Sequence, residues 1–403
     1  MRTKVSEISE LVVLELSNIL AGPSVGMFLA ELGARVIKVE NTNTDGDATR
    51  KWKTPTEDED TDISTYFSSA NWGKESIALD LRAEGALDVV YDLARKADIV
   101  LLSYKPGDEK KLGLDYETLR ALNPRIVYAQ ITAYGGDDPR VGFDAIIQAE
   151  SGFTYLNGEP DGPPTKMPVA LVDILLAHQL KEGIFLALLK RERTGEGSHI
   201  TVSLLKAATA SLANQAANWL VAGVIPERIG SEHPNIAPYG TILKASDGRK
   251  IVVAAATERQ YNYLLDVLDL GHLREDERFT TNQNRVKNRW ELIPLLAEKM
   301  ELLSSDEIVA AFSERHIPFG FVNNMKEVFE QKAAAELVVE GQLPDGTPLQ
   351  GIHTCAIEGS LFEADETLAP PPNFNQHRDA ILADFLGYAS DQIEALRKAG
   401  ATA

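Results

Sequence analysis

The stretch LVVLELSNILAGPSVGMFLAELGARVIKVE, residues 11–40, contains a complete strand–helix–strand pattern. Residues 11–17 form a short apolar run rich in β-branched side chains, which is typical of a buried strand. Residues 24–32 have the pattern of a helix, and residues 34–40 form a second apolar run. A strand, a helix and a second strand in this order predict a parallel sheet and an α/β fold.

The loop inside this pattern, residues 18–23, indicates where a ligand would bind. Pro23 suits the first turn of a helix, and Gly33 suits its end. The unit resembles half of a Rossmann fold, but it has no G-x-G-x-x-G motif, so we predict no dinucleotide site. Ligands of open α/β sheets bind at the carboxyl ends of the strands. We therefore expect the loop and the segment after Glu40 to lie near a crevice.

Further strand and helix patterns extend the predicted sheet. Strands are expected at residues 76–81, 97–104 and 125–135, and residues 41–65 are expected to form a polar surface loop. The segments that follow the strands are rich in small, aromatic or basic residues. We expect the crevice to be lined by residues 20–23, 71–74, 103–111 and 134–144.

The second half of the chain predicts a smaller domain inserted into the first. Residues 207–223 are expected to form one Ala-rich helix, and residues 241–256 a hairpin around an Asp-Gly turn. Helical patterns follow, and the tail has strand-like and helical segments that we expect to return to the first domain. The predicted organisation is a Rossmann-like large domain built from both chain ends, residues 1–224 and 331–403, and an α+β small domain, residues 225–330.

Composition excludes several classes of protein. There are 60 acidic and 40 basic residues, a net charge of −20, so nucleic acid is a poor partner. The single cysteine, Cys355, permits no disulfide within the chain, which suits a reducing cytoplasm. The N-terminus is polar and shows no signal peptide, and residues 207–223 contain too many amides for a membrane span. We expect a cytoplasmic protein without a nucleic-acid or membrane partner.

Asp173 is the candidate catalytic residue. It follows a Gly/Pro-rich loop and precedes a long apolar helix pattern ending in Thr-Gly-Glu-Gly. One interpretation is a carboxylate that only stabilises the helix start. The other is a nucleophile kept ionised by the helix N-terminus, as attack on an acyl carbon requires. The two interpretations are compatible.

A series of motifs resembles the family III CoA transferases, the CaiB/BaiF group that includes formyl-CoA transferase and carnitine CoA-transferase. In chain order the motifs are VLELSNILAGP, LGARVIKVE, NWGKESIALDL, YKPGDEKKLGLDYETLRALNPRIVYAQITAYG, GPPTKMPVALVD, RTGEGSHITVSLL, HPNIAPYG and IPFGFVNN. Together they cover most of the chain.

The resemblance implies a mechanism that uses Asp173. Its carboxylate would attack an acyl-CoA thioester, form a mixed anhydride and then an aspartyl-CoA thioester, and pass CoA to a free carboxylic acid. A small dicarboxylate such as succinate is the expected acid, and succinyl-CoA the expected donor. The resemblance also implies an intertwined homodimer. CoA is a substrate here, and no permanently bound cofactor or metal is expected, since the chain has no H-E-x-x-H motif, cysteine pair or histidine cluster.

The resemblance also places CoA contacts on particular residues. They are Leu20 and Ala21, then Ala70, Asn71, Trp72 and Gly73, then Ser103, Tyr104 and Lys105, and finally Lys111 and Arg140. Each of the three basic residues among them, Lys105, Lys111 and Arg140, could instead be a solvated surface charge. Formyl-CoA transferase has Gln at the position of Leu20, so the resemblance does not extend to formate or oxalate specificity.

Residues 142–144, Gly-Phe-Asp, bear on the main alternative. The α-methylacyl-CoA racemases share this fold and pair the same aspartate with a His-Asp sequence for proton transfer. Phe143 cannot transfer a proton, which disfavours a racemase. Asp144 either assists catalysis or orients a loop. His233 is either a loop histidine without a role or a contact for the acceptor carboxylate. A third possibility is a non-catalytic acyl-CoA-binding protein, if Asp173 points away from the crevice.

Overall fold

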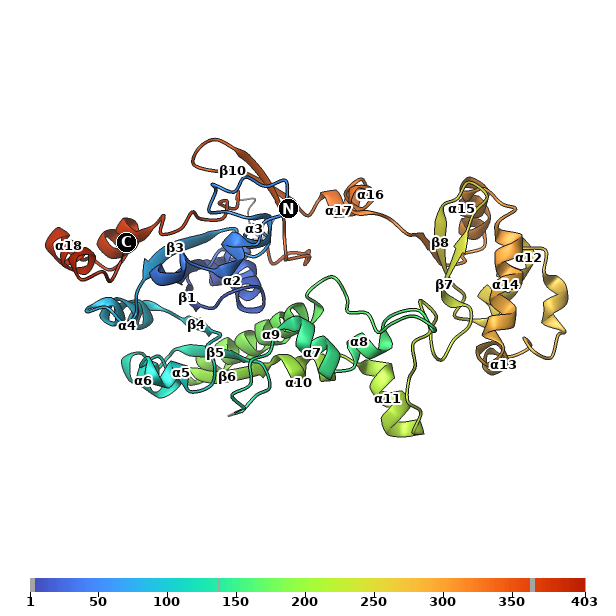
Figure 1. The fold of residues 1–403 in the computed structure, drawn as a ribbon, viewed down its shortest axis with the longest axis horizontal. Coiled ribbons are helices and arrows are strands. Elements are labelled where there is room, and N and C mark those ends of the chain that lie inside the picture. The colour runs from blue at the N-terminus through green and yellow to red at the C-terminus, as the bar shows by residue number, and fades with distance from the viewer. Residues whose placement is uncertain (1–3, 137, 363–366, 403) are drawn as a thin grey trace. The chain divides into compact units, whose positions relative to one another are not determined.

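The chain forms two compact units in the computed structural model, which describes residues 4–136, 138–362 and 367–402 (Figure 1). The first unit comprises Met1–Ser151, Pro168–Leu212 and Lys332–Ala403. The second comprises Gly152–Met167 and Ala213–Gln331.

A six-stranded sheet organises the first unit, and all its strands pair in parallel. The parallel sheet predicted from residues 11–40 is confirmed. The strand order is β3-β2-β1-β4-β5-β6, so the order reverses direction between β1 and β4, where open α/β sheets bind their ligands. The strands are β1 (Val12–Leu16), β2 (Arg35–Asn41), β3 (Lys74–Leu79), β4 (Ile99–Leu102), β5 (Val127–Thr132) and β6 (Ser198–Ser203).

The first helix of the sheet, α2 (Ala21–Glu31), begins earlier than predicted. The sequence pattern predicted a start at residue 24, whereas the helix begins at Ala21 and Pro23 lies in its first turn. The physical reason is a sharp turn at Ile19, whose φ of 74° redirects the chain within a shorter loop. Gly33 follows the helix with a φ of 104°, as its predicted role in ending the helix requires.

One face of the sheet is covered by an apolar core. Leu14, Ile37 and Ile77 of the strands pack with helices α4 (Ala86–Lys96) and α6 (Tyr116–Leu122). Apolar residues of the C-terminal tail complete this core, so distant parts of the sequence share it. On the opposite face, α2 packs against the central strands and against the long helix α9 (Leu171–Thr194).

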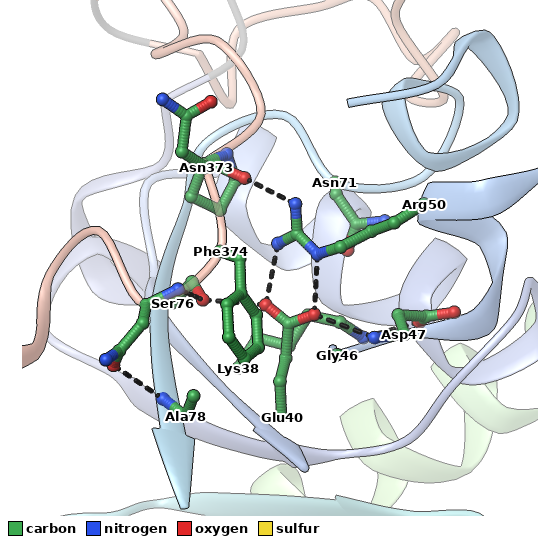
Figure 2. A network of polar contacts seen from close by, with 12 residues as sticks. Lys38, Glu40, Gly46, Asp47, Arg50, Asn71, Ser76, Ala78, Asn373 and Phe374 are labelled. Carbon is green, nitrogen blue, oxygen red and sulfur yellow. Dashed lines mark hydrogen bonds and ion pairs between the residues drawn. The ribbon is translucent and has the colours of Figure 1, made fainter. Parts of the chain in front are cut away.

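The C-terminal tail also closes the free edge of the sheet. The backbone N–H of Ala78 in β3 donates to the side chain of Asn375 at 2.8 Å (Figure 2). The carbonyl oxygen of Ala78 accepts a hydrogen bond of 2.8 Å from the hydroxyl of Thr402. The N–H of Ser76 donates to Nδ1 of His377 at 3.1 Å. Side chains of the tail thus supply the partners that a seventh strand would otherwise provide.

The remaining elements of the first unit are short. They are α1 (Ser6–Ser9), the 3₁₀ turns η1 (Thr42–Thr44) and η2 (Ala48–Lys51), α3 (Thr65–Ser68), α5 (Asp108–Lys111), α7 (Asp144–Glu150), α10 (Leu204–Ala210), α17 (Lys332–Ala335), β10 (Val338–Gln342), β11 (Pro348–Ile352), the π-helical turn η4 (Ala380–Phe385) and α18 (Ser390–Lys398). β10 and β11 pair as an antiparallel hairpin.

Two expectations from the sequence were wrong, one for a loop and one for a helix. Residues 41–65 are not simply a surface loop, because Asp47, Thr49 and Arg50 are buried and fully engaged in hydrogen bonds. The predicted single helix over residues 207–223 is broken into α10 and α11 (Ala213–Ala222). The break falls at residues 211–212, and α11 starts at Ala213, whose φ of 47° is incompatible with a continuous right-handed helix.

The second unit contains a three-stranded antiparallel sheet of order β7-β8-β9. β7 (Tyr239–Lys244) and β8 (Lys250–Ala254) confirm the predicted hairpin, whereas β9 (Phe319–Phe321) was not predicted as a strand. Apolar residues of this sheet and of the helices form a separate core. The other elements are α8 (Phe153–Leu156), α12 (Glu258–Val267), η3 (Gly271–Arg274), α13 (Asn282–Lys287), α14 (Arg289–Met300), α15 (Ser305–Glu314) and α16 (Met325–Phe329).

Across the described ranges of both units, none of the helices combines the length and the apolar character needed to cross a bilayer.

Candidate active site

A cavity of about 270 Å³ lies at the carboxyl ends of β1, β4 and β5. It therefore occupies the point where the strand order reverses, as the topology leads one to expect. Its volume is below the roughly 300–1,000 Å³ of pockets that enclose a whole drug-sized ligand, so it would hold one end of a molecule as long as CoA. The lining residues are 18–22, 103–106, 131–133 and 140–143, together with Asp173 and Leu204.

Asp173 lies in the first turn of α9 and contributes to the wall of this cavity. Its side chain is buried, with 9% of its surface exposed. Burial, reinforced by the charge of Asp144, raises the pKa of Asp173 to about 7. Among the described residues, no hydrogen-bond donor contacts its carboxylate. The α9 N-terminus favours the ionised form, but the carboxylate is poorly solvated and has no fixed partner.

Asp144 holds the start of α9 in place. Its Oδ1 accepts a hydrogen bond of 2.8 Å from the backbone N–H of Val172, and its Oδ2 accepts one of 2.7 Å from Gln148. Because Ala170, the residue before the helix, provides no side-chain cap, Asp144 satisfies a backbone donor that would otherwise lack a partner. Both oxygens of Asp144 are therefore engaged in structural contacts beside Asp173.

Six of the residues identified from the motifs line the cavity: Leu20, Ala21, Ser103, Tyr104, Lys105 and Arg140. Lys105 is exposed at the rim. Arg140 is paired with Asp138 at 2.8 Å and lies 3.7 Å from the centre of the Tyr134 ring. Of the two basic residues in the cavity lining, Lys105 is exposed to solvent, whereas Arg140 forms an ion pair with Asp138.

The segment Ala70 to Gly73 does not line the cavity, and its expected position in the crevice was wrong. Ala70, Asn71 and Trp72 are fully buried. Trp72 packs against Met27 and Val339, because the hairpin β10–β11 covers it. Gly73 lies against Leu368 of the tail. Lys111 is also outside the lining; it is exposed and paired with Asp108 at 2.7 Å. For all five residues, contact with CoA stays a prediction.

His233 belongs to the second unit. Its Nδ1 accepts a hydrogen bond of 3.1 Å from the backbone of Asn235, and its carbonyl oxygen accepts one of 2.8 Å from Arg289. The ring packs edge-on against Tyr239. Burial lowers the pKa of His233, so the ring is neutral at pH 7. A role in binding the acceptor acid stays a prediction.

Tyr66 of α3 was not identified from the sequence. Burial raises its pKa, and the charges of Asp173, Asp144 and Asp47 add to this effect, which places the phenol within electrostatic range of the cavity carboxylates. Its ring packs edge-on against Trp52, with ring centres 5.0 Å apart. Tyr66 directly follows the segment predicted to be a surface loop, residues 41–65, and no motif marked it.

A network of buried charges contacts the loop that follows β1, and Figure 2 shows Lys38, Glu40, Asp47 and Arg50 of this network. Lys38 pairs with Asp47 and with Glu15, each at 3.0 Å. Glu15 also pairs with Lys74 at 2.8 Å, and Arg50 pairs with Glu40. Although burial opposes the charge on Lys38, its two carboxylate partners hold its pKa above the usual range. The three cations in this network are Lys38, Lys74 and Arg50, and the three anions are Glu15, Glu40 and Asp47.

Known proteins are similar to this chain over most of its length. The profile of CoA-transferase family III matches residues 8–378. The succinate–glutarate CoA-transferase of Agrobacterium fabrum is 37% identical over 380 residues, which is 92% of this chain and 94% of that protein. The human succinyl-CoA:glutarate CoA-transferase is 35% identical over 393 residues, which is 96% of this chain and 88% of that protein.

A crystal structure of a CaiB/BaiF family protein from Brucella suis is similar over most of the chain. It superposes with a TM-score of 0.80 at 38% sequence identity and covers 94% of this chain and 100% of that one.

Proposed function

This chain belongs to CoA-transferase family III, and we propose that it transfers CoA from succinyl-CoA to a small dicarboxylic acid through Asp173. Glutarate is the first candidate acceptor, because two relatives that match most of the chain carry it in their names. The buried carboxylate of Asp173 in the lining of a cavity at the strand-order reversal supports this reaction.

The proposed reaction has balanced covalent steps. A carboxylate oxygen of Asp173 attacks the thioester carbonyl carbon, the C–S bond breaks, and CoA leaves as a thiolate, which gives a mixed anhydride of succinate and Asp173. The thiolate attacks the Asp173 acyl carbon, releases succinate and forms an aspartyl-CoA thioester. The acceptor carboxylate then displaces the thiolate, which finally attacks the acceptor's acyl carbon and regenerates Asp173. Covalent catalysis of this kind divides one difficult exchange into easier steps.

The observation that carries the proposal is the lack of hydrogen-bond donors to Asp173 within the described residues. A carboxylate that accepts several hydrogen bonds is stabilised in its charged form and is a weak nucleophile. Asp173 is instead buried with its pKa raised to about 7. Its neighbour Asp144 has both oxygens engaged by Val172 and Gln148, so of the two carboxylates Asp173 is the one available to attack.

The test is a transfer assay with succinyl-CoA and a panel of acids that includes glutarate. Asp173→Asn should lower kcat at least about 10³-fold, because no nucleophile remains. Glu182→Gln removes an exposed carboxylate from the same helix and serves as the matched control with unchanged activity. Hydroxylamine added during turnover should convert Asp173 of the wild type to a hydroxamate, which peptide mass spectrometry detects.

Two outcomes would contradict the proposal. One is the absence of transfer for every donor and acid, with exchange of the α-proton of a 2-methylacyl-CoA in its place, as a racemase would show. The other is an Asp173→Asn variant that keeps wild-type turnover.

The pH dependence gives an independent check. Because attack requires the ionised carboxylate and burial raises the pKa of Asp173 to about 7, kcat/KM should rise with pH through about 7 and then level off. The profile is measured with succinyl-CoA and glutarate below saturation. A profile that is flat from pH 5 to pH 8 would show that the titrating nucleophile is a different group.

A homodimer is the final part of the proposal. Phe185, Leu186 and Leu189 of α9 are exposed apolar side chains, and leaving them in water is unfavourable. Analytical ultracentrifugation measures the oligomeric state, and a monomer at micromolar concentration would contradict this part.

A further inference from the structure

The loop that follows β1 holds a strained residue at the cavity wall. Ile19 has a φ of 74°, a left-handed conformation that a β-branched side chain adopts at a cost of roughly 1–3 kcal/mol. Ile19 lines the cavity together with its neighbours Asn18 and Leu20. Helix α2 begins two residues later, at Ala21, without a side-chain cap at Leu20. The conformation of Ile19 therefore determines where the cavity-lining backbone lies.

Asp47 holds this conformation from beneath. Its two carboxylate oxygens accept the backbone N–H of Ile19 at 3.3 and 3.2 Å. The same carboxylate accepts from the backbone N–H and the hydroxyl of Thr49 and is paired with Lys38. All of these partners are donors, and Asp47 is 1% exposed. Only an ionised, acceptor-only group satisfies this arrangement.

Two lysines hold the loop on either side of Ile19. Lys38 donates to the carbonyl oxygen of Ser17 at 2.8 Å, and Lys74 donates to the carbonyl oxygen of Pro23 at 2.9 Å. Glu15 binds both ammonium groups and thereby fixes their positions. Two lysines of the sheet, together with Asp47 of the segment after β2, thus hold the backbone of residues 17–23 before, at and after Ile19.

We propose that Asp47 is a positioning residue for the transferase reaction: by binding the Ile19 N–H it keeps the loop that forms one wall of the cavity in the arrangement that faces Asp173. Asp47 acts through Ile19 and need not touch the substrate. The inference rests on the proposed function for its kinetic consequence, whereas the link between Asp47 and Ile19 can be tested without turnover.

Asp47→Asn is the first variant. It keeps the size of the side chain, but its amide group must turn a donor toward one of the existing donors. We expect kcat/KM for CoA transfer to fall about 10–100-fold, because a misplaced wall disturbs the geometry around Asp173. Asp45→Asn removes an exposed carboxylate from the same loop and should leave kcat/KM unchanged.

Glycine at position 19 separates positioning from general stability. Glycine adopts a positive φ without strain, so Ile19→Gly in the Asp47→Asn background should recover at least about tenfold of the lost kcat/KM. Ile19→Ala in the same background also removes the side chain but keeps the steric barrier to a positive φ, and it should not recover activity. Recovery by alanine as well as glycine, or by neither in folded protein, would overturn the proposal.

Hydrogen exchange gives a readout that does not depend on activity. In unliganded Asp47→Asn the amides of residues 17–22 should exchange faster than in the wild type, while those of β7 and β8 in the second unit stay unchanged. Unchanged exchange at residues 17–22 would overturn the proposed link. If wild type transfers no CoA but this difference is present, the proposed function fails and the Asp47–Ile19 link stands.

Discussion

The two faces of the six-stranded sheet differ in what they bury: one buries apolar side chains and the other a network of charges. One face carries Leu14, Ile37 and Ile77, packed under α4 and the C-terminal tail in a continuous apolar core. The other carries Glu15 and Lys38 on two of the same strands, β1 and β2, and both side chains are fully buried. Adjacent residues of one strand thus point into an apolar core on one side and into an ion network on the other.

This difference indicates what each face contributes. Apolar burial stabilises the fold with little demand on geometry. Buried ion pairs regain little more than the cost of desolvation, so they are poor sources of stability, but they require definite partners. The charged face has such partners, and three of them are backbone groups of the cavity loop. The apolar face holds the sheet together, whereas the charged face fixes the position of the loop.

The largest effect on stability should come from Lys38→Met. The substitution leaves Asp47 buried without its cation and Glu15 with Lys74 alone, and we expect a loss of about 3–5 kcal/mol in the free energy of unfolding. The variant protein that does fold should also have a lower kcat/KM, because the carbonyl oxygen of Ser17 loses its hydrogen bond from Lys38. Urea denaturation followed by circular dichroism measures the first effect and initial rates the second. A wild-type kcat/KM per folded molecule would show that the charged face does not fix the position of the cavity loop.

Ile77→Ala tests the apolar face. Ile77 is fully buried, and its truncation should cost about 2–5 kcal/mol, nearly as much as the loss of Lys38. Here, however, kcat/KM per folded molecule should stay at the wild-type value, because Ile77 packs in the apolar core and makes none of the hydrogen bonds that hold residues 17–23. The same two assays apply, and a large loss of kcat/KM would show that the two faces are not separate in function.

Asp47 and Asp173 are two buried carboxylates whose removal should have opposite effects. Although burial disfavours ionised Asp47, Lys38 and Thr49 hold its pKa below the usual range, so its contribution to stability is present above pH 4 and lost on acidification. The pKa of Asp173 is raised to about 7, so the folded state binds the extra proton between pH 4 and pH 7 and loses stability as pH rises.

At pH 8, Asp173→Asn should therefore stabilise the protein by about 2–4 kcal/mol and Asp47→Asn should destabilise it. At pH 4 the gain from Asp173→Asn should vanish. Thermal melts of both variants at the two pH values measure this. The same sign of change for both variants at pH 8 would contradict the assigned electrostatics.

The smallest effect should come from Lys51→Met, next to the buried Arg50. Lys51 is exposed and pairs with exposed Asp45, so the free energy of unfolding should change by less than about 1 kcal/mol. Arg50→Met is the matched comparison. Arg50 forms a buried ion pair with Glu40, so this substitution should lower the free energy of unfolding several times more. Equal losses in the two variants would show that burial does not determine how much these ion pairs contribute to the free energy of unfolding.

The sequence allowed part of this structure to be predicted, for physical reasons. Hydrophobic periodicity is local, so residues 11–40 were enough to identify the parallel sheet, and the position of Asp173 at a helix start is also visible locally. The partners of Asp47 are not local: Ile19 and Lys38 come from different loops and strands. Opposite charges inside adjacent apolar strands, at Glu15 and Lys38, were the available signal for the network.

The predicted place of Trp72 failed for a related reason. Its burial depends on the hairpin β10–β11, which lies more than two hundred and fifty residues later in the chain. No pattern around residues 70–73 reveals that cover. The same limit explains why Tyr66 was missed, since the charges of Asp173 and Asp144 that act on it come from segments about 80 to 110 residues later in the chain.

The closure of the sheet edge by the tail has a consequence for how the protein is made. β3 is among the early strands to leave the ribosome, yet its outer backbone groups find their partners in Asn375, His377 and Thr402. Until residues 375–402 are translated, that edge remains open and can pair with another chain. The first unit can therefore complete its fold only after these residues are made, and products truncated before residue 375 should aggregate through β3.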